Sequence, residues 1–191
     1  MRIRHLRILS ATAVALLSLS GAAQADGHGS LCSNATLKGP YGFSAQGEVL
    51  GLLDATGQLH SFATPSILND VAIVTFDGAG HFARTDFGNM NGVPKGGQTA
   101  FNPNQSGTYT VNADCTGSMQ ITYTAGPVPA GVVLALEMVV ADDGTVVKAL
   151  IATETVPSAG PTADGTTCSS NCQLGVQVSF EGKKVLVYGF R

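Results

Sequence analysis

The sequence predicts an all-β fold, an antiparallel meander of about eight strands closing into a barrel behind a cleaved signal peptide. Several segments alternate apolar and polar residues with period two, as half-buried strands do. Asp-Gly and Asn-containing turns separate these segments. The composition, with 24 glycines, 12% charged residues and no Trp, is that of a turn-rich β protein. Consecutive hairpins build a meander, and closure into a barrel removes its exposed edges.

The N-terminus has the features of an export signal. Arg2, Arg4 and Arg7 form a basic region, residues 8–19 are apolar, and Ala23-Gln24-Ala25 is a small-x-small cleavage site. The apolar stretch is too short to span a membrane. We therefore expect residues 1–25 to be a signal peptide and residues 26–191 to form a single β-barrel domain, secreted or periplasmic and not inserted in a membrane.

The first half of the mature chain gives clear strand patterns. Tyr41, Phe43, Ala45, Gly47 and Val49 share one face of a predicted strand. Further along, the sequence predicts an apolar strand at 71–76, a turn at 77–80 and a strand at 82–87. A turn at 112–115 then joins strands at 108–111 and 118–124.

The second half continues the pattern. The run 132–140 is apolar on both faces and has four β-branched residues, which favours a buried strand. The turn at 142–144 leads to a strand at 146–155, and residues 174–180 alternate. Glu181-Gly182 is interpreted as a turn separating the last two strands. Three polar or Gly-rich segments are predicted loops: 52–66, 88–105 and 157–173.

Four cysteines allow three disulfide pairings. We favour Cys32–Cys115, which ties the N-terminal segment to a mid-chain turn, together with Cys168–Cys172, which closes a short loop. A metal role for Cys168 and Cys172 is disfavoured because no second Cys/His pair lies nearby and exported thiols usually oxidise.

The charge balance excludes some partners. Loss of the three leader arginines leaves seven basic against thirteen acidic residues, a formal charge of −6. Nucleic acid and anionic membranes would not be attracted to such a protein.

Three short blocks resemble a group of uncharacterised secreted bacterial proteins. They are residues 37–43 (LKGPYGF), residues 76–80 (FDGAG) with Thr85-Asp86 following, and residues 107–117 (GTYTVNADCTG). This group looks like soluble antiparallel barrels of the calycin or allene-oxide-cyclase-like type. The resemblance covers about residues 32–125 and implies the fold and export, but it carries over no functional residue.

Three charged residues are candidate ligand-binding groups. Arg84 and Asp86 lie two apart on one strand face and could anchor a ligand's polar head inside the barrel. If Phe76 pairs with His81, they face Ile73 and Val71. Glu137, between Leu136 and Met138, could be a cavity carboxyl with a raised pKa. The alternatives are a partly exposed ion pair of little energetic value and a carboxyl on the solvent face.

A weaker candidate is a metal site at the processed N-terminus. Cleavage after Ala25 would expose Asp26-Gly27-His28, whose amine, two amides and imidazole can bind Cu(II) or Ni(II) in one plane. The alternative is a histidine that is third by chance. His60 and His81 are too isolated to predict a metal cluster or a triad, and no hydrolase, metalloprotease or phosphate-loop motif is present.

The leading hypothesis is an exported, disulfide-stabilised barrel without cofactor that binds a small apolar or amphipathic molecule. Such a barrel can equally be filled by its own side chains. One alternative is a cyclase or isomerase acting on a lipid-like substrate, with Glu137 or Asp86 as the acid or base. Others are a structural or adhesive exported protein and a small outer-membrane barrel, which the few aromatics and the cysteines disfavour.

Overall fold

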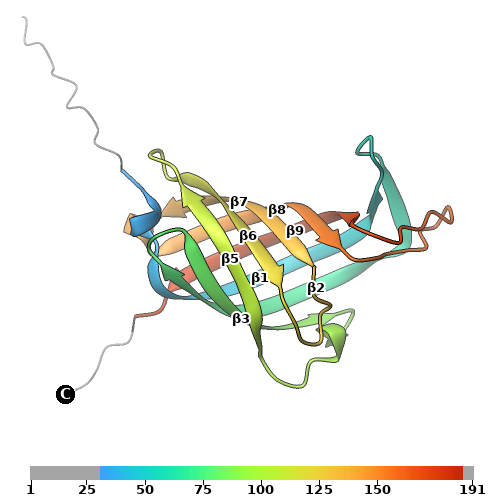
Figure 1. The fold of residues 1–191 in the computed structure, drawn as a ribbon, viewed down its shortest axis with the longest axis horizontal. Coiled ribbons are helices and arrows are strands. Elements are labelled where there is room, and N and C mark those ends of the chain that lie inside the picture. The colour runs from blue at the N-terminus through green and yellow to red at the C-terminus, as the bar shows by residue number, and fades with distance from the viewer. Residues whose placement is uncertain (1–30, 187–191) are drawn as a thin grey trace, which may run out of the picture.

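The computed structural model describes residues 31–186 (Figure 1). The predicted signal peptide, residues 1–25, and the predicted metal site at Asp26-Gly27-His28 lie outside these residues. Eight long strands make up the fold, with one two-residue strand, β4 (Val93–Pro94), and three short 3-10 helices, η1 (Asn34–Thr36), η2 (Lys95–Gly97) and η3 (Asp142–Gly144). The long strands are β1 (Lys38–Leu53), β2 (Leu59–Asp77), β3 (His81–Met90), β5 (Asn102–Val111), β6 (Thr116–Tyr123), β7 (Val133–Ala141), β8 (Val146–Val156) and β9 (Cys172–Lys184).

The eight long strands form a closed antiparallel barrel. Their order is β2-β1-β9-β8-β7-β6-β5-β3, and β2 also pairs with β3, which closes the cylinder. Each strand therefore neighbours the next in sequence, and β9 returns to pair with β1. This confirms the predicted meander and its closure. None of the short 3-10 helices in residues 31–186 has the length or apolar character that a membrane-spanning helix needs.

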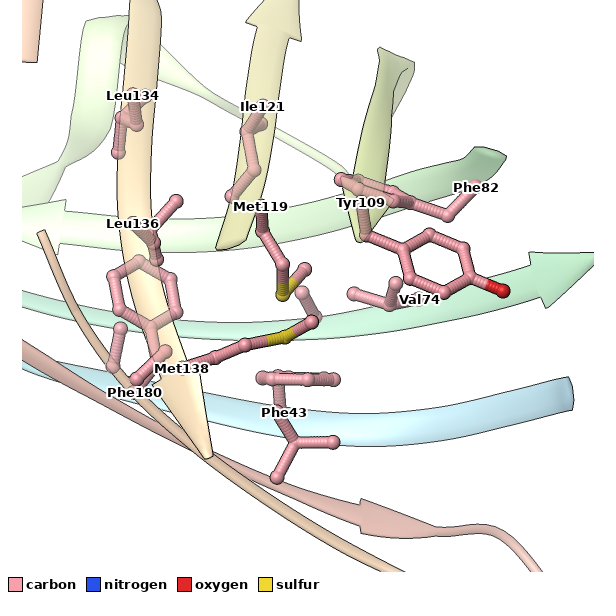
Figure 2. Close-up of a cluster of buried hydrophobic side chains, with 14 of the residues drawn as sticks. Phe43, Val74, Phe82, Tyr109, Met119, Ile121, Leu134, Leu136, Met138 and Phe180 are labelled. Carbon is pink, nitrogen blue, oxygen red and sulfur yellow. The ribbon is translucent and has the colours of Figure 1, made fainter. Parts of the chain in front are cut away.

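The barrel interior is an apolar core. Alternate residues of the strands point inward, as in β7, where Leu134, Leu136 and Met138 are buried and Glu137 is exposed. Figure 2 shows the side chains of Leu134, Leu136 and Met138 meeting side chains of the opposite strands. At one end, Phe76 packs edge-on against three rings, with centroid distances of 5.2, 5.6 and 4.9 Å to Tyr41, Phe82 and Tyr109.

One predicted turn is wrong. β9 runs without a break through Glu181 and Gly182, and Gly182 pairs with Phe43 of β1. A Cβ at Gly182 would lie 2.3 Å from Cζ of Phe43. The glycine is therefore explained by an aromatic ring packed directly over the backbone and not by a turn.

The β2–β3 register also differs from the expectation by one residue. Phe76 pairs with Phe82, so Arg84 pairs with Val74 and Asp86 with Ala72. Five residues, 77–81, therefore separate the two paired phenylalanines, where four were expected. Asp77 Oδ1 stabilises this turn by accepting hydrogen bonds from the amides of Ala79 (2.6 Å) and His81 (3.0 Å). Arg84 and Asp86 share the inward face of Phe82, and their partners on β2 are the buried Val74 and Ala72 in place of the exposed Ile73 and Val71.

Both favoured disulfides are present, one at each end of the barrel. Cys32–Cys115 joins the N-terminal segment to the β5–β6 turn, and Cys168–Cys172 closes the loop before β9. The first spans 83 residues, and chain entropy gives such a crosslink about 4.5 kcal/mol of stabilisation. Next to it, Leu37 is fully buried. This end of the barrel is plugged by residues of the N-terminal segment.

The opposite end carries the connecting segments. The predicted loop at 52–66 is instead mostly strand, because β1 and β2 extend beyond the barrel and turn only at residues 54–58. In Figure 1 this teal hairpin projects beside the orange-red segment 157–171. The segment 91–101 carries β4 and η2, so the predicted loop at 88–105 is shorter than expected.

Candidate functional site

A cluster of charged side chains lies inside the barrel between the apolar core and this second end. Arg84 donates to Asp70 Oδ1 from Nη2 (2.6 Å) and to Asp86 Oδ2 from Nη1 (2.8 Å). Lys95 Nζ, from η2, donates to Asp70 Oδ2 and Asp86 Oδ2, both at 2.6 Å. The Tyr123 hydroxyl donates to Asp86 Oδ2 at 3.0 Å and accepts from Lys95 (3.0 Å) and Arg84 (3.2 Å). Two cations and two carboxylates leave the cluster formally neutral.

Two glutamines complete the cluster. Asp86 Oδ1 accepts from Gln105 Nε2 (2.6 Å) and Gln98 Nε2 (3.1 Å), while Gln105 Oε1 accepts from Arg84. Gln98 Oε1 also accepts from the Gly88 amide at 3.0 Å, which attaches the 91–101 segment to β3. Within residues 31–186, every buried side-chain nitrogen and oxygen has a hydrogen-bond partner. The cluster thus meets the condition under which burying charge is tolerated.

The buried charges shift one another's pKa values. Burial alone would raise the pKa of Asp86, but Arg84 and Lys95 outweigh it and hold that pKa well below its usual range. Burial raises the pKa of Asp70, and Asp86 adds to this, while Arg84 and Lys95 oppose it. Burial alone would lower the pKa of Lys95, but Tyr123 and the two carboxylates raise it. The raised pKa keeps the Lys95 ammonium charged at neutral pH.

Arg84 and Asp86 are buried on one face, 3% and 0% exposed, so the alternative of a partly exposed pair is wrong. Their hydrogen-bonding groups are nevertheless directed to each other, to Asp70 and to the glutamines. Direct ligand contact by Arg84 and Asp86 stays a prediction. What the structure shows is that they hold Lys95 and Tyr123 in place.

A cavity of about 370 Å³ lies on the outer side of the cluster, at the second end of the barrel. Lys95 and Tyr123 contribute to its wall, and the other walls are mainly apolar, including Leu68, Met90, Val128, Val132, Leu134 and Leu174. Phe62 of β2 and residues 157–159 line it too. Its volume is in the range of small-molecule sites.

Glu154, like Lys95 and Asp70 of the cluster, is a candidate residue that the sequence did not reveal. A β-bulge lies here, because Ala135 pairs with Thr153 but Leu136 pairs with Ile151. Inward positions along β8 would otherwise continue from Ile151 to Thr153, but the bulge turns Thr153 outward and Glu154 to the cavity. Burial raises the pKa of Glu154, and Lys95 opposes this. Only an interrupted alternation at 151–154 could have signalled it.

Glu137 does not have the interior position that was considered for it. It is exposed on the outside of β7 and borders a hollow of about 730 Å³ on the outer surface of the barrel. That hollow is lined by outward-facing side chains such as Ser44, Lys148 and Glu181. The alternative of a solvent-facing carboxyl is therefore the one that the structure shows, and the interior carboxyl is Glu154.

Hydrogen bonds and ion pairs join the extended β1–β2 hairpin to the 157–171 segment beside the cavity. His60 Nδ1 lies 2.7 Å from Asp164 Oδ2, and its Nε2 lies 3.5 Å from Asp54 Oδ2. The Ala163 amide donates to the Ser61 carbonyl at 2.8 Å. The hydrogen bond to Asp164 raises the pKa of His60, against the effect of partial desolvation. His60 is thus not isolated, although residues 31–186 contain no group of His, Cys, Asp and Glu arranged to hold a metal.

Comparisons with models of protein families, with curated proteins and with solved structures find no match. The fold and the site by themselves define a closed, eight-stranded antiparallel barrel with an apolar cavity at one end and a buried, neutral charge cluster at its base.

Proposed function

We propose that this protein is an exported, non-enzymatic barrel that binds a small amphipathic molecule in the cavity at the second end of the barrel. The observation that carries the proposal is the cavity itself, about 370 Å³ in volume, with mainly apolar walls and a polar base. The two disulfides suit the oxidising compartment to which the predicted signal peptide would direct the chain. The resemblance to calycin or allene-oxide-cyclase-like barrels belongs to the same proposal.

The charge cluster supports this interpretation because it gives the mainly apolar cavity a polar base through Lys95 and Tyr123. Hydrogen bonds hold the 91–101 segment against the strands from inside, through Lys95 and Gln98. The cluster lies at the base of the cavity, and the apolar walls above it include core residues such as Leu68, Val132 and Leu134. A rigid polar base under apolar walls is an arrangement that orients an amphipathic ligand.

Binding can be tested with the neutral fluorophore N-phenyl-1-naphthylamine, whose emission rises in an apolar site. Val156, half-buried at the cavity wall, is changed to Phe to fill the space. Val139→Phe, at an exposed position on the outside of β7, is the control. We expect the wild type and Val139→Phe to bind alike, and Val156→Phe to bind at least about tenfold more weakly. Equal binding by both variants, or no binding by the wild type, would contradict the proposal.

The enzymatic alternative finds little support at the residues first considered for it. Asp86 accepts hydrogen bonds from five donor groups and lies behind the cavity wall, and Glu137 is outside the barrel. Among the ionisable side chains that line the cavity within residues 31–186, Glu154 is the one with uncommitted oxygens. A proton-transfer reaction in this cavity would have to use Glu154.

A further inference from the structure

The polar side chains that line the cavity differ in whether their hydrogen-bonding groups are available to a ligand. The polar side chains lining it are Ser66, Lys95, Tyr123, Glu154 and Ser158. The two serines are neutral, so the charged groups decide which kind of head group is favoured. Lys95 would ordinarily be the partner of an anionic ligand.

Lys95 has no hydrogen-bond donor to spare. An ammonium group has three N–H donors, and here they go to Asp70, Asp86 and Tyr123 at 2.6, 2.6 and 3.0 Å. The single donor of Tyr123 goes to Asp86. An anionic head group would have to break one of these bonds and leave a buried carboxylate short of a donor.

The carboxyl of Glu154, in contrast to the ammonium of Lys95, is available to bind a ligand. Its side chain is half-buried at the cavity wall, and within residues 31–186 no hydrogen bond and no salt bridge shorter than 4.0 Å reaches its carboxyl. The bulge in β8 turns it inward, so its position is built into the strand. A carboxylate in an apolar wall gains a hydrogen bond when a ligand donates one to it.

We infer that the cavity selects a molecule with an apolar body and a hydrogen-bond-donating head, an amine or a hydroxyl, which binds Glu154, and that it rejects carboxylates and other anions. This inference rests on the proposed function, since it names the class of ligand for the same cavity. A fatty acid, the ligand that a lysine at the base would suggest, is therefore excluded.

The test uses three ligands with the same ten-carbon chain, decylamine, decan-1-ol and decanoate, whose sizes suit the cavity. Each competes with N-phenyl-1-naphthylamine at about pH 8, where an alkylamine is protonated and decanoate is ionised. We expect decylamine to bind most tightly, the alcohol next, and decanoate at least about tenfold more weakly than decylamine. Decanoate binding as tightly as decylamine would overturn the inference.

Glu154→Gln is the decisive variant, and Glu137→Gln, which removes an exposed carboxylate from the outer surface, is its control. Glutamine still accepts a hydrogen bond, so alcohol binding should persist, while decylamine loses its advantage and decanoate binds more tightly. Glu137→Gln should keep the wild-type order. An unchanged order in Glu154→Gln would refute the role of Glu154.

Two readouts keep the conclusions separate. If the fluorophore binds in the cavity but the ligand order is wrong, only the inference fails. If the wild type does not bind the fluorophore, the proposed function fails and the inference fails with it. In case Glu154→Gln does not fold, carboxyl ¹³C NMR of the wild type is an independent check, because the charged decylamine should lower the pKa of Glu154 by more than the neutral donor decanol does.

Discussion

Removing the arginine from the buried charge cluster should strongly destabilise the protein. Arg84 is 3% exposed and donates to Asp70 and Asp86, so Arg84→Met leaves two carboxylates facing Lys95 alone. The loss of one partner from a buried ion pair costs about 3–5 kcal/mol of unfolding free energy. For a chain of this length that corresponds to a fall of roughly 6–20 °C in Tm.

The assay is urea denaturation of the processed protein, followed by far-UV circular dichroism. Lys148→Met is the matched control, because Lys148 Nζ lies 3.9 Å from Glu181 Oε2 and both side chains are exposed. Such a surface pair contributes no more than about 1 kcal/mol. The reasoning would be refuted if Arg84→Met lost no more unfolding free energy than Lys148→Met.

The pH dependence of the same variant gives a second measure. Without Arg84, the pKa of Asp70, which burial already raises, should rise further in the folded state and exceed the unfolded value. The folded state then binds more protons than the unfolded state in the window between these two pKa values, so stability increases as the pH falls through it. The difference in unfolding free energy between wild type and Arg84→Met should therefore shrink on mild acidification. A difference that is constant or grows would contradict this account.

Two further predictions concern the glycine under an aromatic ring and the bonds that join the hairpin to the 157–171 segment beside the cavity. Gly182→Ala places a Cβ 2.3 Å from the Phe43 ring, and thermal unfolding should show a loss of about 1–3 kcal/mol of unfolding free energy. Gly42→Ala is the control, because no neighbouring atom lies within 4 Å of its Cβ, and it should change the unfolding free energy by less than about 1 kcal/mol. Similar losses in both would show that the ring contact is unimportant. Because the pKa of His60 is raised by folding, its stabilising effect is complete below its unfolded pKa of about 6.5 and is lost as the pH rises through the folded value. Hydrogen exchange of the Ala163 amide, corrected for its intrinsic rate, should therefore lose protection in the wild type as the pH rises above about 6.5. His60→Gln should show no such change, and a parallel loss in both would exclude His60 as the cause.

The functional candidates were only partly predictable. Arg84 and Asp86 could be placed on one strand face, but the face itself depends on a turn whose length is set by hydrogen bonds to Asp77. Lys95 lies in a segment with no regular pattern, and only the folded chain brings it 2.6 Å from both carboxylates. Glu154 was hidden by a bulge. In each case a shift of a single residue or a contact distant in sequence decides which way a side chain points.

The sequence by itself determined the all-β class and the order of the hairpins, because period-two alternation and turn residues are local signals. For the cysteines it favoured one of three pairings, and the folded chain decided between them. Tertiary structure alone decided what lies inside the second end of the barrel. Alternation has a period of two, so one extra residue in a turn or a bulge exchanges inside and outside for everything that follows until the next irregularity. The register of β3 and the bulge of β8 are such irregularities, and they place the charge cluster and Glu154 around the cavity.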